Sequence, residues 1–363
     1  MTIASVELKK IYGKFCYNFF GSYSPRILKV TYEISFRCNL KCATCFFWRD
    51  DAWKKTLNKV ASGKELDTAG AIAAINNIAR SGARAVTITG GEPFIRKDIN
   101  QIIEHLGKTG LSTTIATNGT LLSKSHAKQL VESRINTLSF SVDGPEAIND
   151  RIRGKNVYLR LRQAVRSVMH AKASLASKYP RITMNTTISA LNLDELEKII
   201  DVACDLGIGN FSIHHTMFVN PDAIKKSPDW IYLPKDFKLS ETLINNRAQT
   251  EKLKEKIELI RKRARKMGVR VEFFPDLKGE EIEKYYLDAD YSFRDRCYYP
   301  WVETRISPSG DIYACDMGFK AGNILEDELR NVWNGKKYRQ FRSALKNAKL
   351  FPFCRKCCKI SVW

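Results

Sequence analysis

The stretch LKVTYEISFRCNLKCATC, residues 28–45, decides the fold of this chain. Its first half, residues 28–36, is rich in β-branched and apolar side chains and predicts a buried strand. Three cysteines follow at once, Cys38, Cys42 and Cys45, in C-x3-C-x2-C spacing. A closed zinc site and a four-iron cluster each normally take four protein ligands. Three thiolates with no fourth cysteine nearby therefore predict an iron–sulfur cluster that leaves one iron open to a small molecule.

Outward from this stretch, short β-branched segments alternate with amphipathic ones as far as residue 216. Strands are predicted at 28–36, 83–89, 111–117, 135–142, 181–189 and 208–216, and helices at 68–82, 97–110, 121–134, 157–174 and 193–207. Strict alternation favours parallel β/α units joined by right-handed crossovers. Because eight units close a complete barrel, six strands predict an α/β fold with a partial, open (β/α)6 barrel.

Polar motifs follow the predicted strands, and ligands of parallel β/α folds bind at that edge. Gly90-Gly91-Glu92-Pro93 comes after the second strand, where paired glycines allow a close backbone approach and Glu92 can accept hydrogen bonds from an ammonium group. Asn118 follows the third strand and Asn185 lies on the fifth. Each motif alone is also ordinary turn chemistry, but the set in this order predicts a ligand site.

The cysteine triplet just after the first strand, with the GGEP element after the second, resembles the radical S-adenosylmethionine (SAM) enzymes. The resemblance implies that Cys38, Cys42 and Cys45 hold a [4Fe-4S] cluster whose open iron chelates SAM. Reduction of that cluster then releases a 5′-deoxyadenosyl radical, which takes a hydrogen atom from the substrate. A one-electron reductant such as flavodoxin or ferredoxin is the implied partner.

The same resemblance implies which residues contact SAM. Thr44 stands where the family usually has an aromatic residue beside the adenine, and two phenylalanines follow the third cysteine instead. The GGEP element is expected to hold the amino group, and residues after the fourth and fifth strands the ribose. The full set is Thr44, Phe47, Gly90, Gly91, Glu92, Asn118, Ser141, Asp143, Arg153 and Asn185.

A second group of cysteines lies in the last third of the chain. Cys297 and Cys315 flank residues 306–313, which predict a β-hairpin with a Pro-Ser-Gly-Asp turn, and Cys354 and Cys357 form a C-x2-C unit. Four thiolates complete a closed site, and zinc and an iron–sulfur cluster both fit four thiolates.

The C-x12-G-x4-C spacing from Cys297 to Cys315 resembles the Twitch or SPASM extension of radical SAM enzymes. The resemblance implies one auxiliary [4Fe-4S] cluster held by Cys297, Cys315, Cys354 and Cys357, so that the chain carries two [4Fe-4S] clusters. Cys358 is then an alternative ligand, a structural residue or a hydrogen-atom donor.

The chain of 363 residues divides into four expected parts. They are an N-terminal extension (1–27), the partial barrel (28–216), a connector that carries the sixth helix and is a candidate cover of the active site (217–296), and the auxiliary-cluster domain with a β-hairpin and a helix (297–363). Within the connector, a long helical pattern is predicted at 239–268 with its end at Gly268, followed by a strand at 269–275. No run of about 18 apolar residues predicts a membrane-spanning helix. The N-terminus lacks the uninterrupted apolar core of a signal peptide, so a cytoplasmic protein is expected.

The formal net charge of +21 indicates either an anionic partner or a solvated basic surface. Nucleic acid is not favoured, because no helix-turn-helix, zinc-finger or RNA-binding signature accompanies the charge. The first 25 residues mix lysines with phenylalanines and tyrosines. This composition fits either a helix packed on the outside of the barrel or an amphipathic segment in peripheral contact with a membrane surface.

The first hypothesis for function is a radical SAM oxidoreductase that acts on a small molecule, such as an anionic sugar, cyclitol or lipid head group. An auxiliary cluster can accept the electron that a substrate radical loses, which favours a net oxidation over a redox-neutral outcome. The alternative is a maturase that modifies a ribosomally made peptide, and a third hypothesis is a structural metal-binding protein. His214 and His215, at the end of the sixth strand, are candidates for substrate contact, although core packing also explains such a pair.

Overall fold

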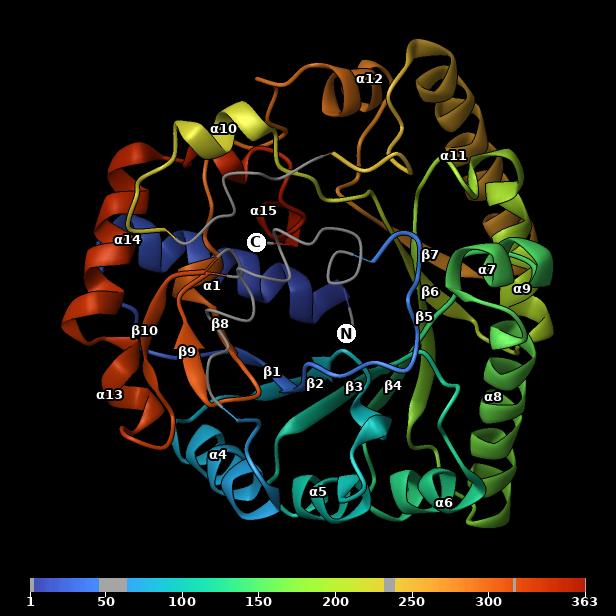
Figure 1. Cartoon of the computed structure of the whole chain (residues 1–363), viewed down its shortest axis with the longest axis horizontal. Coiled ribbons are helices and arrows are strands. Elements are labelled where there is room, and N and C mark those ends of the chain that lie inside the picture. Colours follow the sequence, from blue (N-terminus) through green and yellow to red (C-terminus); the bar gives the residue numbers. More distant parts are fainter. Residues whose placement is uncertain (1–2, 46–63, 232–238, 316–317, 363) are drawn as a thin grey trace.

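The computed structural model describes residues 3–45, 64–231, 239–315 and 318–362. Within them one ten-stranded sheet has the order β10-β9-β8-β1-β2-β3-β4-β5-β6-β7. Its strands curve around a common interior with helices on the outside (Figure 1). The strands are β1 Lys29–Ser35, β2 Ala85–Gly90, β3 Ser112–Thr117, β4 Thr137–Ser141, β5 Arg181–Thr187, β6 Asn210–His214, β7 Arg270–Phe274, β8 Glu303–Ile306, β9 Asp311–Tyr313 and β10 Lys320–Asn323.

The helices follow the order expected of β/α units. They are α1 Ile3–Phe19, α4 Thr68–Arg80, α5 Ile99–Gly107, α6 Lys124–Glu132, α7 Glu146–Arg153, α8 Val157–Ser174, α9 Ile199–Asp205, α10 Pro221–Lys225, α11 Arg247–Met267, α12 Glu280–Leu287, α13 Leu329–Trp333, α14 Lys336–Ala348 and α15 Lys359–Val362. Each of the six predicted strands is present and parallel to the next. The predicted α/β partial barrel is therefore confirmed.

The segment expected to be a connector contributes to the sheet as well. Residues 269–275, which read as a strand, form β7, and β7 pairs in parallel with β6. The long helical pattern over 239–268 forms a helix only from Arg247, because the Asn246 side chain caps the helix there by accepting from the Gln249 N–H at 3.0 Å. Gly268 ends the helix in a left-handed conformation, as predicted.

The C-terminal part is joined to the barrel by backbone hydrogen bonds. Strand β8 pairs in parallel with β1, so that Thr31 lies opposite Arg305, and β8 and β9 form the predicted antiparallel hairpin. Gly310 closes the hairpin turn with a φ of +85°, a conformation that glycine adopts without strain. The sheet thus passes from the barrel into the cysteine-rich segment without interruption.

The two faces of the barrel sheet differ in chemistry. Residues such as Val86, Ile88 and Met184 face the outer helices and are buried, which forms the main core. The alternate positions of β2 to β6 are half-buried or polar, among them Thr87, Thr89, Ser139, Thr183, Asn185, Ser212 and His214. Because strand side chains alternate between faces, the barrel interior has a polar lining.

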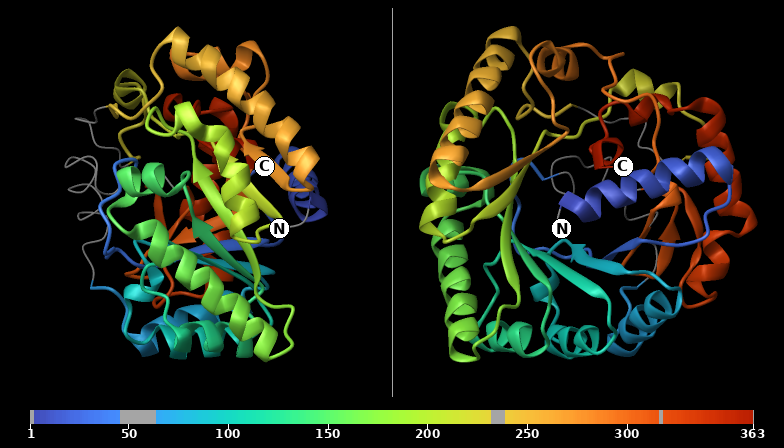
Figure 2. Two further views of the ribbon diagram at one scale, coloured as in Figure 1. Left: turned by 90° about the vertical axis from the view of Figure 1, so that its right-hand side faces the viewer. Right: turned by 180° about the vertical axis from the view of Figure 1, so that it is seen from behind.

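Helix α1 crosses the end of the barrel opposite to the cysteine triplet. Seen from behind, it lies in front of the strands (Figure 2). Lys9 of this helix is buried close enough to Lys29 and Glu303, at the first residues of β1 and β8, for both charges to affect its pKa. The helix therefore covers the amino ends of these strands, whereas the predicted SAM motifs lie at the carboxyl ends.

Candidate active site

The three cysteines lie on the loop that leaves β1. The Cys45 N–H donates to the Cys42 carbonyl at 3.0 Å, and the Leu40 N–H donates to the Cys38 sulfur at 3.4 Å. Burial raises the pKa of Cys38, and it raises the pKa of Cys42 to about 11, with the neighbouring thiols adding to both effects. The three sulfurs therefore lie near one another, and a bound cation would favour their ionised form.

A zinc ion and a four-iron cluster require different distances between the cysteine sulfurs that bind them. In the part of the chain that the structure describes, no three His, Cys, Asp or Glu side chains converge as they would on a single metal ion. Zinc draws its ligands to within about 2.0–2.3 Å of one centre. In a four-iron cluster each thiolate binds a different iron, so the sulfurs stay further apart.

The glycine pair after β2 packs against the chain that enters the cysteine loop. A Cβ on Gly90 would lie 2.2 Å from the Ser35 carbonyl oxygen, and one on Gly91 would lie 2.3 Å from the Arg37 carbonyl oxygen. The Gly91 N–H donates to Ser35 at 2.8 Å, and the Glu92 N–H donates to Arg37 at 2.9 Å. The sequence analysis expected the glycines to admit a ligand. In the structure they first admit the backbone of the cysteine loop.

Glu92 is buried and holds the end of β3. One carboxylate oxygen accepts from the Thr117 hydroxyl at 2.7 Å and the Phe94 N–H at 3.1 Å, and the other accepts from the Asn118 N–H at 2.7 Å. Burial nevertheless raises the pKa of Glu92 to about 7. A nearby cation would stabilise such a carboxylate, and the oxygen bonded to Asn118 keeps a lone pair. This geometry fits the predicted contact with an ammonium group.

Asn118 joins the end of β3 to the cysteine loop. Its side-chain nitrogen donates to the Asn39 side-chain oxygen at 3.1 Å and lies 3.9 Å from the Cys38 sulfur. Its oxygen accepts from the Thr120 N–H at 2.9 Å. Hydrogen bonds to the sulfurs influence the reduction potential of a cluster, so Asn118 is placed to affect the electronic properties of the Cys38 thiolate as well as to hold the loop.

Helix α7 lies nearby and was not predicted from the sequence, where residues after the fourth strand were expected to contact the ribose of SAM. The Ile152 carbonyl accepts from the Ala43 N–H at 2.8 Å, which docks the cysteine loop on the helix. Arg153 pairs with Asp143 at 2.8 Å, and its charge opposes the rise in the pKa of Cys42. The sequence does contain one sign of a helix in this segment, namely the apolar residues Ile148 and Ile152 at positions i and i+4, and both are buried.

Asp143 and Ser141 differ in exposure. Asp143 is buried, and its other carboxylate oxygen accepts from the Thr187 N–H at 2.9 Å, which ties the end of β4 to β5. Ser141 is half-buried at the last position of β4 and lies opposite Asn185 in the ladder. Of these two predicted ribose contacts, Ser141 is the more accessible one.

A row of polar side chains crosses β4, β5 and β6. The Asn185 side chain donates to the Ser139 hydroxyl at 2.8 Å and accepts from the Ser212 hydroxyl at 2.6 Å. The Ser212 oxygen lies 3.0 Å from Nε2 of His214. We call Ser139, Asn185, Ser212 and His214 the polar row. Burial and the charge of Lys359 lower the pKa of His214 to about 4, so this imidazole is neutral at pH 7.

The second predicted histidine lies in the core. His215 is buried with Nδ1 2.9 Å from the Tyr286 hydroxyl and its ring beside that of Tyr285. Burial lowers the pKa of His215 to about 3. Among the SAM contacts, Thr44 is half-buried in the cysteine turn, and Phe47 lies outside the described residues.

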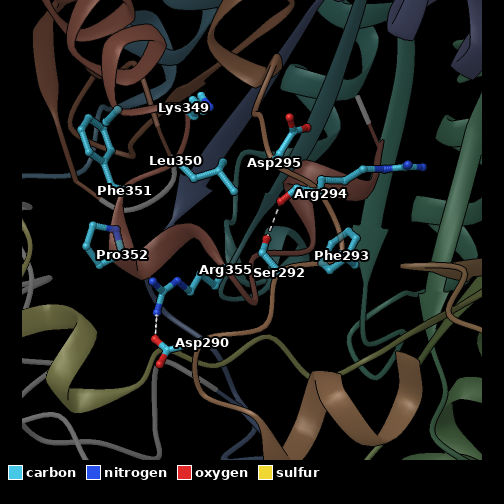
Figure 3. A pocket seen from close by; sticks show the side chains of 11 residues that line it. Asp290, Ser292, Phe293, Arg294, Asp295, Lys349, Leu350, Phe351, Pro352 and Arg355 are labelled. Atoms are coloured by element: carbon cyan, nitrogen blue, oxygen red, sulfur yellow. Dashed lines mark hydrogen bonds and ion pairs between the residues drawn. The ribbon is translucent and has the colours of Figure 1, made fainter. Parts of the chain in front are cut away.

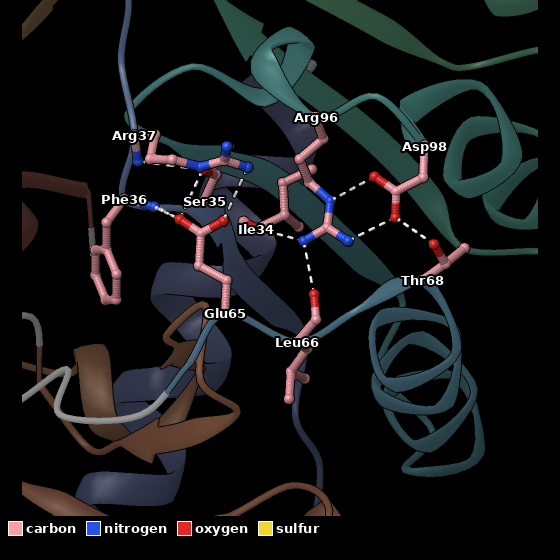
Figure 4. A network of polar contacts seen from close by, with 9 residues as sticks. All are labelled: Ile34, Ser35, Phe36, Arg37, Glu65, Leu66, Thr68, Arg96 and Asp98. Carbon is pink, nitrogen blue, oxygen red and sulfur yellow. Dashed lines mark hydrogen bonds and ion pairs between the residues drawn. The ribbon is translucent and has the colours of Figure 1, made fainter.

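A further polar network fixes the first residues of the cysteine loop (Figure 4). Glu65 accepts from the Phe36 N–H at 2.9 Å. Arg96 donates to the Ile34 carbonyl at 3.1 Å and pairs with Asp98 at 2.6 Å. The sequence analysis did not single out these charged residues, because their partners lie on other segments. Their contacts hold the backbone at the start of the cysteine loop.

The second group of cysteines lies around one cavity. Cys297, Cys315, Cys354 and Cys357 line it, together with Tyr299, Pro300, Phe341, Leu345, Phe351, Phe353, Lys359 and Ile360. Cys297, Cys354 and Cys357 are buried, and Cys315 is half-buried. These are the four cysteines predicted to hold an auxiliary cluster, and the mostly apolar wall suits a group that must be kept from water.

Cys358 lies beside this cavity but does not line it. Its thiol is hydrogen-bonded to Cys357, and this contact together with burial raises the pKa of Cys357. Burial also raises the pKa of Cys354, to which the thiols of Cys315 and Cys297 add. The raised pKa values of Cys354 and Cys357 favour a cationic occupant of the cavity, which would stabilise their thiolates.

An open cavity of about 610 Å³ adjoins the four-cysteine cavity and shares Phe351 with it. Residues 290–295 and 348–355 supply its walls, with Arg355 paired to Asp290 at one side (Figure 3). No sequence motif indicated this cavity. Its lining mixes both charge signs with apolar groups, and we assign it no ligand.

An open parallel barrel with a cysteine triplet after β1 and a four-cysteine cavity beside it is the architecture of a SAM-dependent iron–sulfur enzyme. A model of the radical SAM superfamily matches residues 32–231, and a model of SPASM, an iron–sulfur cluster-binding domain, matches residues 297–358. The chain belongs to the radical SAM superfamily and carries a C-terminal SPASM domain, as the sequence analysis predicted.

Curated relatives share about a quarter of their residues with this chain. The AdoMet-dependent heme synthase of Methanosarcina barkeri is 26% identical over 88% of this chain and 85% of the relative. The PqqA peptide cyclase of Xanthomonas campestris pv. campestris is 23% identical over 88% of this chain and 76% of the cyclase. The match to the Fe-coproporphyrin III synthase of M. barkeri, at 26% identity, covers 52% of this chain and 44% of that protein, so this chain spans less than half of it.

Two solved structures show the same fold. Streptococcus suis SuiB bound to its precursor peptide SuiA has a TM-score of 0.62 at 18% identity, covering 94% of this chain and 74% of that chain. The enzyme anSMEcpe with bound AdoMet has a TM-score of 0.61 at 17% identity, covering 90% of this chain and 88% of that chain. No helix in the described ranges is both long and apolar enough to cross a membrane.

Proposed function

We propose that this radical SAM enzyme oxidises a peptide, with one auxiliary [4Fe-4S] cluster at Cys297, Cys315, Cys354 and Cys357. When bound, SAM and the cluster of the cysteine triplet supply reductive carbon–sulfur cleavage and hydrogen-atom abstraction. We thus favour a peptide substrate, the alternative in the sequence-based hypotheses, over a small-molecule substrate, which was the first of them. Its support is the similarity to the PqqA peptide cyclase over 88% of the chain and to SuiB, whose structure contains a precursor peptide, over 94%.

The residues at the carboxyl ends of the strands would hold SAM. Glu92 would accept from its ammonium group, and Ser141 and Asn185 are the candidates for its ribose hydroxyls. Gly90 and Gly91 keep the cysteine loop against β2, and Asn118 fixes Cys38. The Asp143–Arg153 pair would act mainly by holding helix α7 against the loop, since both side chains already contact each other at 2.8 Å.

The polar row is suited to a peptide backbone. Its hydroxyl, amide and imidazole groups can both donate and accept, as an extended backbone with free N–H and C=O groups requires. Oxidation by loss of two hydrogens releases one proton after the hydrogen atom has been removed. His214 is neutral at pH 7 because its pKa lies at about 4. Since Ser212 gives its one hydroxyl hydrogen to Asn185, Nε2–H of His214 donates to Ser212, and Nδ1 is the ring nitrogen that can accept that proton.

The observation that carries the oxidative proposal is the position of Lys359. It lines the four-cysteine cavity, it lies 3.8 Å from Glu303 at the start of β8, and its charge reaches His214. Lys359 therefore belongs to the wall of the auxiliary site and also acts on the electrostatic environment of the polar row. An electron acceptor for an oxidised substrate needs such a position, whereas a purely structural metal does not.

The test begins with anaerobically purified enzyme, which should contain about eight irons per chain if two four-iron clusters are present. Incubation with SAM, dithionite and peptides encoded beside the gene should yield 5′-deoxyadenosine and a peptide lighter by two hydrogens. The Cys297→Ala variant should still form 5′-deoxyadenosine but leave the peptide unoxidised. If wild-type enzyme forms 5′-deoxyadenosine and no peptide changes mass, the peptide proposal fails.

A small anionic molecule is the second candidate substrate. The heme synthase of M. barkeri is the specific reason, because it aligns with 85% of its own length. Consumption of a carboxylated small molecule in the same assay, with all peptides unchanged, would favour this candidate.

A further inference from the structure

Exposed apolar side chains are concentrated on one segment of this protein. The described residues contain 14 large hydrophobic side chains that are exposed, and six of them fall between residues 8 and 23. They are Leu8 (65% exposed), Ile11 (65%), Phe15 (47%), Phe19 (73%), Phe20 (42%) and Tyr23 (46%), which we call the apolar stripe. Single exposed hydrophobic residues are common on soluble proteins, but a contiguous group marks an interaction surface.

The stripe forms one face of helix α1 and the turn that follows it. At 100° per residue, Leu8, Ile11, Phe15 and Phe19 lie within an arc of about 80°. The ring centroids of Phe15 and Phe19 are 4.9 Å apart, and those of Phe15 and Phe20 are 5.5 Å apart. The exposed rings thus cover one another and form a continuous surface.

The opposite face of α1 is firmly packed, so the stripe faces outward for a structural reason. Cys16 and Tyr17 are buried, with the Tyr17 ring 5.0 Å from that of Trp301. A Cβ on Gly13 would lie 2.7 Å from Val302, which shows how closely the helix backbone approaches the barrel. The helix cannot turn its apolar stripe inward without giving up these contacts.

Charge favours an anionic partner for this surface. Of the three lysines in α1, Lys9 is buried against the barrel, Lys10 is half-buried and Lys14 is exposed, and the whole chain has a formal net charge of +21. Lys14 is exposed on the same helix, beside the stripe. A second copy of the chain would bring two strongly cationic proteins together, whereas a bilayer with anionic lipids offers both an apolar interior and a negative surface.

We propose that α1 docks this enzyme on the surface of an anionic lipid bilayer, with the apolar stripe inserted at the level of the head groups. Helices that lie in the interface carry aromatic and aliphatic side chains on one face and lysines beside it. Because α1 covers the amino ends of β1 and β8, docking leaves the edge that carries the cysteine triplet directed away from the lipid (Figure 2).

The test is co-sedimentation of the full chain with vesicles of phosphatidylcholine, alone or mixed with phosphatidylglycerol. We expect at least about tenfold tighter binding to the mixed vesicles, falling as salt is added. Phe15→Gln/Phe19→Gln should weaken this binding at least about tenfold, and Lys14→Gln about fivefold on the mixed vesicles only. The matched control is Leu159→Gln/Leu175→Gln, which changes two residues of similar exposure elsewhere (46% and 44%) and should bind as wild type.

A second measurement locates the helix in the lipid. Brominated acyl chains should quench the added fluorescence of a Phe15→Trp variant and leave that of a Leu159→Trp variant unchanged. The proposal is overturned if wild type does not bind the mixed vesicles, if Phe15→Gln/Phe19→Gln binds equally well, or if the Leu159 control loses as much binding. It is also overturned if sedimentation without lipid shows a dimer that Phe15→Gln/Phe19→Gln dissociates, because a second copy would then cover the stripe.

Discussion

Replacing Gly91 by alanine should disrupt the cysteine loop while leaving the auxiliary site intact. The new Cβ would lie 2.3 Å from the Arg37 oxygen, 2.6 Å from the Arg37 carbonyl carbon and 2.8 Å from the Phe36 oxygen. Ordinary contacts begin at 3.4 Å, so the first of these atoms must retreat by about 1 Å (3.4 minus 2.3). Since all three belong to the backbone, no side chain can relieve the overlap by changing rotamer.

The cost can be worked from these contacts. Overpacking that moves backbone typically costs about 1–3 kcal/mol. The shift also weakens two hydrogen bonds, from the Gly91 N–H to Ser35 and from the Glu92 N–H to Arg37, each worth about 1 kcal/mol. We therefore expect a loss of about 3–5 kcal/mol in the free energy of unfolding, concentrated where the three cysteines must meet.

The assay is iron content after anaerobic reconstitution, with thermal unfolding followed by circular dichroism. Gly91→Ala should retain about four of about eight irons, those of the auxiliary cluster. Gly209→Ala is the matched control, because a Cβ there meets nothing within 4 Å. It should keep all its iron and gain up to about 1 kcal/mol through a less flexible unfolded chain. A Gly91→Ala protein with full iron and an unfolding midpoint within about 1 °C of wild type would refute this reasoning.

Three further predictions concern charge and ligation. The folded-state pKa of Glu92 lies at about 7, above the usual 4.5. The free energy of unfolding of wild type, relative to that of Glu92→Gln, should therefore fall by about 3 kcal/mol as pH rises from about 4.5 to 7. Denaturant titrations in which the difference between the two proteins does not change with pH would contradict this. Glu303 shows the reverse sign, because Lys29 and its other partners lower its pKa to about 2 despite burial. Glu303→Gln should lower the free energy of unfolding by about 3–5 kcal/mol at pH 7, and this loss should shrink as pH falls below about 4.5. A loss under about 1 kcal/mol at pH 7 would disprove the ion-pair argument. Cys357→Ala should lose the auxiliary iron while Cys358→Ala retains it, and equal loss in both variants would show that the cavity takes either thiolate.

The sequence predicted the barrel well because its strands carry their own signal. Residues 83–89 and 181–189 are β-branched runs between turn residues, and both form strands within two residues of the predicted ends. Helix α7 is only eight residues long and lies between Pro145 and Gly154, so turn residues concealed its period. The over-long prediction for α11 has a similar cause, because one side-chain cap at Asn246 outweighs the helical pattern before it.

Contacts between distant segments could not be predicted from local pattern. Nothing in the residues around Gly91 indicates that the Arg37 carbonyl lies against it, and nothing near Arg96 points to the Ile34 carbonyl. The cysteine sets were more accessible to sequence reasoning, because metal ligation restricts both residue type and spacing. Cys297, Cys315 and Cys354 line one cavity, and their ligation of a cluster stays a prediction.

The ladder between β1 and β8 has a consequence for synthesis of the protein on the ribosome. Thr31 and Glu303, hydrogen-bonded at 2.6 Å, are 272 residues apart in sequence. At about 5–20 residues per second, the first strand therefore emerges roughly 14–54 s before its neighbour exists. Throughout that interval one edge of β1 remains open to pairing with other nascent chains, so slow translation or premature termination before residue 303 should promote aggregation.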